Sequence, residues 1–249
     1  MEQRVVLITG AGRGVGRCMA ETFARAGDAL IIADIVLARA EETAAMVAGS
    51  GAGAIAVQVD VGAGPAVAKM VAEGIARFGR LDVLINAAGS YGKAFRATHE
   101  TPDEEWDSVL DSNLKGSFLC AKYVIPHMMR NKGGRIINFA SNAGRSSSPL
   151  LGATYTSAKT GIIGLTRHLA VEYAPYNILV NTIAPGPLRS DRVSDLIDER
   201  MMADLATRIP LGRLGEFQDV ADVVFFMASD SARYMTGAIL DVNGGFVLA

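Results

Sequence analysis

The feature that most constrains the fold of this chain is the alternation of short apolar runs with longer segments that have the residue spacing of helices. The runs are nearly continuous in apolar residues, which is typical of parallel strands covered on both faces. Seven runs fit this description, at residues 5–8, 29–33, 54–59, 82–86, 135–139, 178–183 and 238–242. Strands that alternate with helices build a parallel sheet with helices on both sides. The sequence therefore predicts an α/β fold of three layers, doubly wound around a seven-stranded parallel sheet.

The organisation of the chain predicts one domain over residues 1–249, because it contains no linker rich in proline, glycine and serine and no internal repeat. Half of the residues are hydrophobic and a fifth are charged, a balance that excludes a disordered chain. The 24 basic and 26 acidic residues nearly cancel, and Lys and Arg form no run. We therefore expect a small-molecule ligand, and neither a nucleic acid nor a membrane as a partner.

Cysteine usage and the amino-terminal residues bear on metal binding and location. Cys18 and Cys120 are the only cysteines, and neither belongs to a cluster with the spacing of metal ligands. We expect no metal site and a reducing compartment. Five apolar residues precede Thr9 and Gly10, too few for the core of a signal peptide, and no apolar run elsewhere reaches membrane-spanning length. These observations predict a cytoplasmic protein.

One helix start is marked by several residues together. Thr101 is the expected N-cap and Pro102 the first helical residue, followed by three acidic residues at 103–105. We expect this helix to run to about Arg130.

A glycine-rich segment, TGAGRGVG at residues 9–16, follows the first predicted strand and leads into a helix that begins near Gly14. Glycines let the backbone approach a pyrophosphate closely, and the free N–H groups at a helix start stabilise an anion. The generic G-x-G-x-x-G pattern is not met, since Val15 and Arg17 stand where its last glycine would fall. A glycine turn that only packs against the sheet would look the same in isolation. The phosphate site is expected at Gly10, Arg13, Gly14, Val15 and Gly16.

Asp34, 18 residues beyond Gly16, ends the second predicted strand. A carboxylate at this place can accept hydrogen bonds from the adenosine ribose hydroxyls and would repel a 2′-phosphate, which favours NAD(H). Arg13 favours NADP(H) instead, because its cation could pair with a 2′-phosphate. NAD is the expected cofactor, and NADP stays open.

Further polar and small residues follow the third and fourth predicted strands. Asp60 and Val61 end the third, and Asn86, Ala87 and Gly89 lie at the end of the fourth. The carboxyl ends of parallel strands form the edge where ligands of doubly wound sheets bind. We expect these residues to contact the cofactor, although each could also belong to an ordinary turn.

Tyr155 and Lys159 are four residues apart in a segment with helical spacing, so they share one helix face. A phenol with a pKa of about 10 is a poor acid or base at neutral pH, and an adjacent ammonium lowers that pKa by stabilising the phenolate. The Y-x-x-x-K pattern is common, and its interpretation depends on the other motifs.

Taken together, these motifs resemble the short-chain dehydrogenase/reductase family. The resemblance covers essentially the whole chain and rests on TGAGRGVG, Asp34, Asp60-Val61, INAAG, Asn113, Ser141, YTSAK, IAPGPLRS and GAILDVNGG. It implies a Rossmann-type fold with a seven-stranded sheet and hydride transfer between NAD(P) and a CH–OH group. Two positions depart from the usual family pattern, namely Ser190 in place of threonine and an extra alanine in the segment 86–89.

The resemblance also implies roles for individual residues. Tyr155 would exchange a proton with the substrate oxygen, and Lys159 would lower the pKa of Tyr155 and bind the nicotinamide ribose. Ser141 would hydrogen-bond the reacting oxygen, and Asn113 would order a water that links Lys159 to solvent. The nicotinamide end of the cofactor would lie against Pro185, Gly186, Leu188 and Ser190.

Two larger features are implied as well. A substrate lid is expected at about 188–210, where Met201, Met202 and Ile209 could adapt to an apolar ligand, although an ordinary surface helix would show the same pattern. The helix at 106–130 and the Tyr155 helix resemble the dimer surfaces of the family, which predicts a homotetramer.

We therefore expect an NAD(H)-preferring oxidoreductase that interconverts a secondary alcohol and a ketone. An NADPH-dependent ketone reductase, for instance of 3-oxoacyl thioesters, is the alternative that Arg13 motivates. A non-catalytic nucleotide-binding regulatory protein is less compatible with the complete set Asn113, Ser141, Tyr155 and Lys159. The substrate itself and the direction of reaction stay open.

Overall fold

The strands form one parallel sheet in the order β3-β2-β1-β4-β5-β6-β7 in the computed structural model, which describes residues 3–49, 51–148, 150–190 and 194–248. Each of the seven predicted strands is present and its ends lie within two residues of the expected ones, so the predicted sheet is confirmed. The strands are β1 Val5–Thr9, β2 Ala29–Asp34, β3 Ala54–Gln58, β4 Val83–Asn86, β5 Gly134–Phe139, β6 Ile178–Pro185 and β7 Ile239–Val242.

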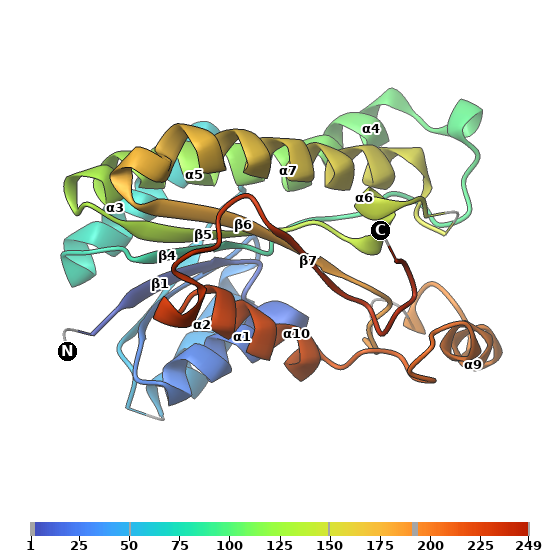
Figure 1. Cartoon of the computed structure of the whole chain (residues 1–249), viewed down its shortest axis with the longest axis horizontal. Coiled ribbons are helices and arrows are strands. Elements are labelled where there is room, and N and C mark those ends of the chain that lie inside the picture. The colour runs from blue at the N-terminus through green and yellow to red at the C-terminus, as the bar shows by residue number, and fades with distance from the viewer. Residues whose placement is uncertain (1–2, 50, 149, 191–193, 249) are drawn as a thin grey trace.

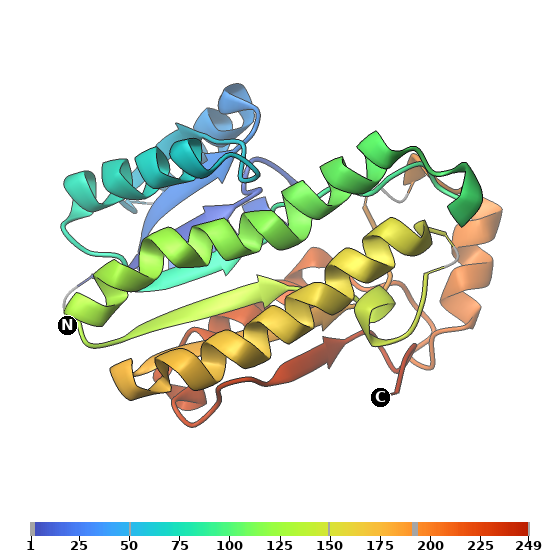
Figure 2. The ribbon, with the colours of Figure 1, turned by 90° about the horizontal axis from the view of Figure 1, so that it is seen from above.

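Helices cover both faces of this sheet, which makes three layers (Figure 1). One face carries α3 Gly64–Phe78, α5 Gly116–Arg130 and α7 Gly152–Tyr173, which run side by side in Figure 2. The other face carries α1 Gly14–Arg25, α2 Leu37–Ala48 and α10 Phe217–Met227. Shorter helices are α4 Asp103–Leu110, α6 Asn142–Arg145 and α9 Glu199–Thr207, with 3-10 turns η1 Thr98–Glu100, η3 Ala174–Tyr176 and η4 Asp230–Ala232.

The two helical layers rest on two separate apolar cores, because successive side chains of a strand point to opposite faces. Leu7 and Ile31 belong to the core beneath α3, α5 and α7, whereas Ile8 and Ile32 belong to the core beneath α1 and α10. All four are fully buried. This explains why the strands read as continuous apolar runs, since neither face of the sheet is left to solvent.

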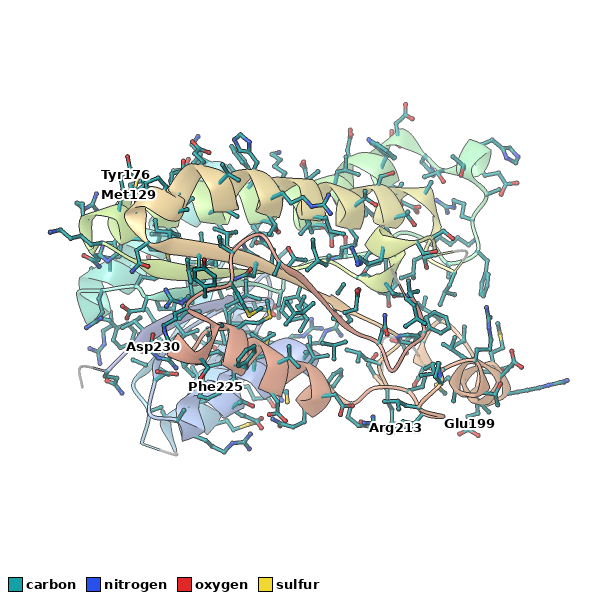
Figure 3. All side chains as sticks on the ribbon, viewed as in Figure 1. Met129, Tyr176, Glu199, Arg213, Phe225 and Asp230 are labelled. Carbon is teal, nitrogen blue, oxygen red and sulfur yellow. The ribbon has the colours of Figure 1, made fainter. Side chains whose placement is uncertain are left out.

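The strand order reverses between β1 and β4, which are neighbours in the sheet. Connections from the two strands leave in opposite directions, and a crevice opens at their carboxyl ends. This is the edge of the sheet at which the sequence predicts the ligand site. Helix α9 lies beyond the same edge, and Figure 3 shows Glu199 and Arg213 at this end and Met129 and Tyr176 at the other.

The helix expected from residue 101 to residue 130 differs from the prediction in two ways. The prediction of Thr101 as N-cap is wrong, because Pro102 is the N-cap, with φ −64° and ψ 147°. Proline fixes only φ, so its ψ can be extended and the helix then begins one residue later. A π-helical turn, η2 Asp111–Lys115, separates α4 from α5. The end at Arg130 is confirmed.

Among the described residues, no helix combines the length and apolar character needed to cross a membrane. The same part of the chain contains no group of His, Cys, Asp and Glu side chains that could hold a metal ion.

Candidate functional site

A cavity of about 1350 Å³ lies at the carboxyl edge of the sheet. All but one of the site residues expected from the sequence line it, although they come from many different loops and helices. They are Gly10, Arg13, Gly14, Val15, Gly16, Asp34, Asp60, Val61, Ala87, Gly89, Asn113, Ser141, Tyr155, Lys159, Pro185, Gly186, Leu188 and Ser190. The structure therefore brings the dinucleotide motifs and the reactive motifs into one space.

The glycine loop between β1 and α1 forms one end of the cavity. Gly10 has a φ of +67°, and a Cβ at Gly16 would collide with the Gly10 carbonyl oxygen, so the turn needs glycine at both positions. Helix α1 begins at Gly14 and has no acidic residue in its first turn. The loop is tied to the end of β4 through Thr9, whose hydroxyl accepts from the Ala88 N–H at 3.1 Å. A tight backbone turn at an uncompensated helix start suits an anionic pyrophosphate.

Asp34 lies beside this loop and is 7 % exposed. Its two carboxylate oxygens accept from the backbone N–H groups of Gly12 at 2.9 Å and Val36 at 3.0 Å. Hydrogen bonds of this kind hold the carboxylate in one orientation. The carboxylate lines the cavity together with Arg13 and with Arg39, a cation that was not predicted from the sequence.

Lys159 is buried, at 4 % exposure, on the face of α7 that covers the sheet. Its ammonium donates to the Phe139 carbonyl oxygen at 2.7 Å and lies 5.4 Å from the centre of the Tyr155 ring. A buried cation needs such partners because burial alone is costly. The ammonium is thus held in one place at the end of β5, under the phenol that faces the cavity.

Ser141 follows β5 and is the N-cap of α6. Its hydroxyl accepts from the Ala143 N–H at 3.1 Å and donates to the Asn142 Oδ1 at 3.0 Å. The hydroxyl hydrogen can rotate away from Asn142 and be donated to a bound oxygen instead. The hydroxyl oxygen would still accept from the Ala143 N–H at the start of α6.

Asn113 lies in the π-helical turn η2, which turns its side chain into the cavity wall. The amide nitrogen donates to the Ser90 and Val109 carbonyl oxygens, both at 2.8 Å. Its Oδ1 is buried and has no hydrogen-bond partner among the described residues. A buried acceptor without a partner is costly, so this oxygen is suited to a water molecule or a ligand.

Asn86 is the one expected site residue that does not line the cavity. It is buried under the site, where its amide donates to the Asn138 Oδ1 at 2.9 Å. Asn138 in turn donates to the Thr166 hydroxyl at 2.9 Å, and Thr166 is 2.6 Å from the Thr182 hydroxyl. The Asn86 side chain thus belongs to a buried polar chain that joins β4, β5, α7 and β6 beneath the cavity.

The other end of the cavity is mostly apolar. Tyr91 packs edge to face on Tyr155, with the ring centres 6.5 Å apart. Met201 of α9 lines the cavity, whereas Ile209 is buried beyond the helix, and residues 191–193 of the expected lid lie outside the described residues. Four aromatic residues that line the cavity were missed in the sequence because no motif marks them; they are Tyr91, Phe95, Phe217 and Phe246, and of these the Phe217 ring lies beside Gly14 of the glycine loop.

Comparison with known proteins agrees with the fold and the motifs. The family model described as enoyl-(acyl carrier protein) reductase matches residues 10–247. The chain is 38 % identical to the hydroxy(phenyl)methylsuccinyl-CoA dehydrogenase subunit BbsD of Thauera aromatica, over 98 % of this chain and 97 % of that protein. It is 37 % identical to a 3-oxoacyl-(acyl-carrier-protein) reductase FabG of Staphylococcus aureus, over 97 % of each chain.

A solved structure is similar over the same extent. The short-chain type dehydrogenase/reductase of Mycobacterium marinum superposes with a TM-score of 0.93 at 31 % identity, covering 99 % of this chain and 96 % of the other. A family match over nearly the whole length, together with the seven-stranded sheet, decides the family. The chain belongs to the short-chain dehydrogenase/reductase family and is an oxidoreductase that acts on hydroxyl or oxo groups.

Proposed function

We propose that this protein interconverts a secondary alcohol and a ketone with NAD(H) as its preferred cofactor and Tyr155 as the general acid or base. Members of the family generally use NAD(P)(H). The observation that carries the proposal is that Tyr155 and Lys159 line the same cavity as the glycine loop and Asp34. A proton donor and a dinucleotide cradle in one cavity are what hydride transfer to a carbonyl requires.

The residues at the cofactor end fit a dinucleotide. The close approach of Gly16 to Gly10 leaves backbone rather than side chains at the start of α1, where phosphates would lie. Asp34 is oriented by its two backbone hydrogen bonds and would accept from ribose hydroxyls. When bound at the inner end of the cavity, the nicotinamide would supply or accept the hydride.

The side chains of the reactive end supply the proton chemistry. In the reduction direction, the Tyr155 hydroxyl gives its proton to the substrate oxygen, and the nearby Lys159 ammonium stabilises the phenolate that remains. Ser141 donates a hydrogen bond to the same oxygen. Asn113 would hold a water through its free Oδ1, which provides a route for protons from solvent toward Lys159. Oxidation follows the same steps in reverse.

Cofactor preference has a second candidate. Arg13 is exposed and Arg39 is half-buried, and both line the cavity, so two cations could pair with a 2′-phosphate. An NADPH-dependent reductase of 3-oxoacyl thioesters is therefore the alternative, and the relative from Staphylococcus aureus is named a 3-oxoacyl-(acyl-carrier-protein) reductase. We favour NAD(H) because the Asp34 carboxylate is held against the glycine loop by the hydrogen bond from the Gly12 N–H, where it would repel the phosphate directly.

The test is a comparison of NADH and NADPH binding by the unaltered protein and by Asp34→Ala. We expect tighter binding of NADH by the unaltered protein and a shift toward NADPH in the variant, because the carboxylate is lost while both arginines remain. Equal or stronger binding of NADPH by the unaltered protein would decide for the alternative. A panel of alcohols, sugars, steroids and 3-oxoacyl thioesters with the preferred cofactor would then identify the substrate class. No turnover with any of them would favour the regulatory function.

The proposal includes assembly and the lid. Residues 188–210 would cover the substrate as a lid on a single domain. A homotetramer would bury the exposed apolar side chains of α4, α5 and α7, such as Trp106, Phe118 and Val171, the last of which is 80 % exposed. Light scattering after gel filtration measures the molecular mass of the assembly. We expect Phe118→Glu to lower that mass, because it places a charge in the proposed subunit contact. A cytoplasmic location belongs to the same proposal, since Cys18 and Cys120 are both free thiols.

A further inference from the structure

Arg17, on the first turns of α1, joins two parts of the chain that are separate in sequence. One guanidinium nitrogen donates to the Gly12 carbonyl oxygen in the glycine loop at 2.7 Å. The other two donate to α2, to the buried Thr43 hydroxyl at 3.1 Å and to the Glu42 carboxylate at 3.0 Å. The guanidinium therefore fastens the glycine loop to α2.

Gly12 is held from its other side as well. Its N–H donates to the Asp34 carboxylate at 2.9 Å while its carbonyl accepts from Arg17. A Cβ at Gly12 would lie 2.6 Å from the Arg39 Cβ and 2.7 Å from the Asp34 Oδ2, so no side chain fits here. The backbone N–H and carbonyl of Gly12 thus connect Arg17 to the Asp34 carboxylate, which lines the cavity.

We propose that Arg17 is a positioning residue for the dinucleotide cofactor, acting through Gly12 on the glycine loop and on Asp34. The inference rests on the dinucleotide binding of the proposed function. Neither Arg17 nor Gly12 lines the cavity, so the effect is transmitted through the backbone. With the loop held in one conformation, cofactor binding does not have to order it, which increases the affinity.

A role in stability alone makes a different prediction. If Arg17 only joined α1 to α2, its loss would lower the melting temperature and leave the affinity for the cofactor unchanged. If it positions the loop, its loss weakens cofactor binding while the KM for the alcohol or ketone stays the same. The two roles are therefore separated by a binding measurement.

NADH, and in parallel NADPH, is titrated without substrate into four proteins, namely the unaltered protein, Arg17→Met, Arg17→Lys and Glu42→Gln. Binding is measured by the fluorescence of the reduced cofactor or by calorimetry. Arg17→Met keeps the length and the apolar stem of the side chain but removes every donor. Arg17→Lys keeps one charged donor, which can reach one of the partners. Glu42→Gln is the matched control, since it removes only the exposed ion pair.

We expect the Kd of the preferred cofactor to rise about tenfold in Arg17→Met, the size expected for loss of a hydrogen bond from a charged donor. Arg17→Lys should recover part of the affinity, and Glu42→Gln should stay within about twofold of the unaltered protein. An unchanged Kd in Arg17→Met, with or without a lower melting temperature, overturns the positioning role alone. Failure of the unaltered protein to bind either dinucleotide overturns the cofactor part of the proposed function and this inference with it.

Discussion

Replacing Thr166 with valine tests how much the hydrogen bonds between α7 and the sheet contribute to stability. Thr166 is fully buried, and its hydroxyl accepts from Asn138 at 2.9 Å and lies 2.6 Å from the Thr182 hydroxyl. Valine has nearly the same shape, so the substitution removes the hydroxyl and leaves the packing in place. The Asn138 N–H and the Thr182 hydroxyl then lose a partner in a region without solvent.

The magnitude follows from these two groups. Each buried polar group left without a partner costs about 1–3 kcal/mol, so two of them lower the free energy of unfolding by about 3 kcal/mol once relaxation and the added methyl are allowed for. In a chain of 249 residues, 1 kcal/mol corresponds to about 2–4 °C of melting temperature. Thr166→Val should therefore melt roughly 6–12 °C below the unaltered protein.

The assay is a thermal melt by circular dichroism at one fixed protein concentration. Thr160→Val is the matched control, because Thr160 lies on the same helix and is exposed, with only a 3.4 Å contact to the Gly144 carbonyl oxygen. We expect the control to melt within about 1 °C of the unaltered protein. Equal melting temperatures for the two variants would refute the reasoning, because the buried chain from Asn86 to Thr182 would then contribute nothing.

Two further predictions concern titratable groups. Burial raises the pKa of the Cys120 thiol to about 12, so iodoacetamide at pH 8 should modify it only in denaturant, and mass spectrometry showing modification of the folded protein would contradict this. Hydrogen bonds from Arg213 and from the Glu216 N–H lower the pKa of Asp219 to about 2, and because this folded pKa is depressed, its contribution to stability is present above about pH 4 and is lost as the pH falls toward 2. In Arg213→Met we expect the pKa of Asp219 to rise toward its ordinary value, measured by carbon NMR of the carboxyl group. An unchanged pKa would show that the Glu216 N–H alone keeps it low.

Much of the fold could be predicted because strands buried on both faces leave a direct mark on the sequence. The runs at β1 and β2 are apolar on both faces and are bounded by Gly10 and by Gly27 with Asp28, so their position and length are readable. The π-helical turn around Asn113 was not predicted, because one extra residue in a helix barely changes the spacing of apolar residues. The cap at Pro102 was misassigned because its ψ is decided by the chain that packs around it.

In the candidate site, too, some features could be predicted from the sequence and others depend on packing. Residues whose backbone lines the cavity, such as Gly10 and Gly16, could be predicted from the glycine spacing taken together with the other motifs. The direction of the Asn86 side chain could not, because it depends on Asn138, 52 residues later in the sequence. The contacts of Arg17 with α2 and of Lys159 with Phe139 likewise appear only when distant segments pack together.

The most direct test of the proposed chemistry is the rate of cofactor-dependent turnover by Tyr155→Phe, measured as NADH absorbance with a substrate that the unaltered protein converts. We predict a kcat lower by about 10²- to 10⁴-fold, the contribution of a positioned acid or base, with an unchanged Kd for NADH because the cofactor cradle is intact. Full turnover by Tyr155→Phe would contradict the assignment of the proton transfer to Tyr155.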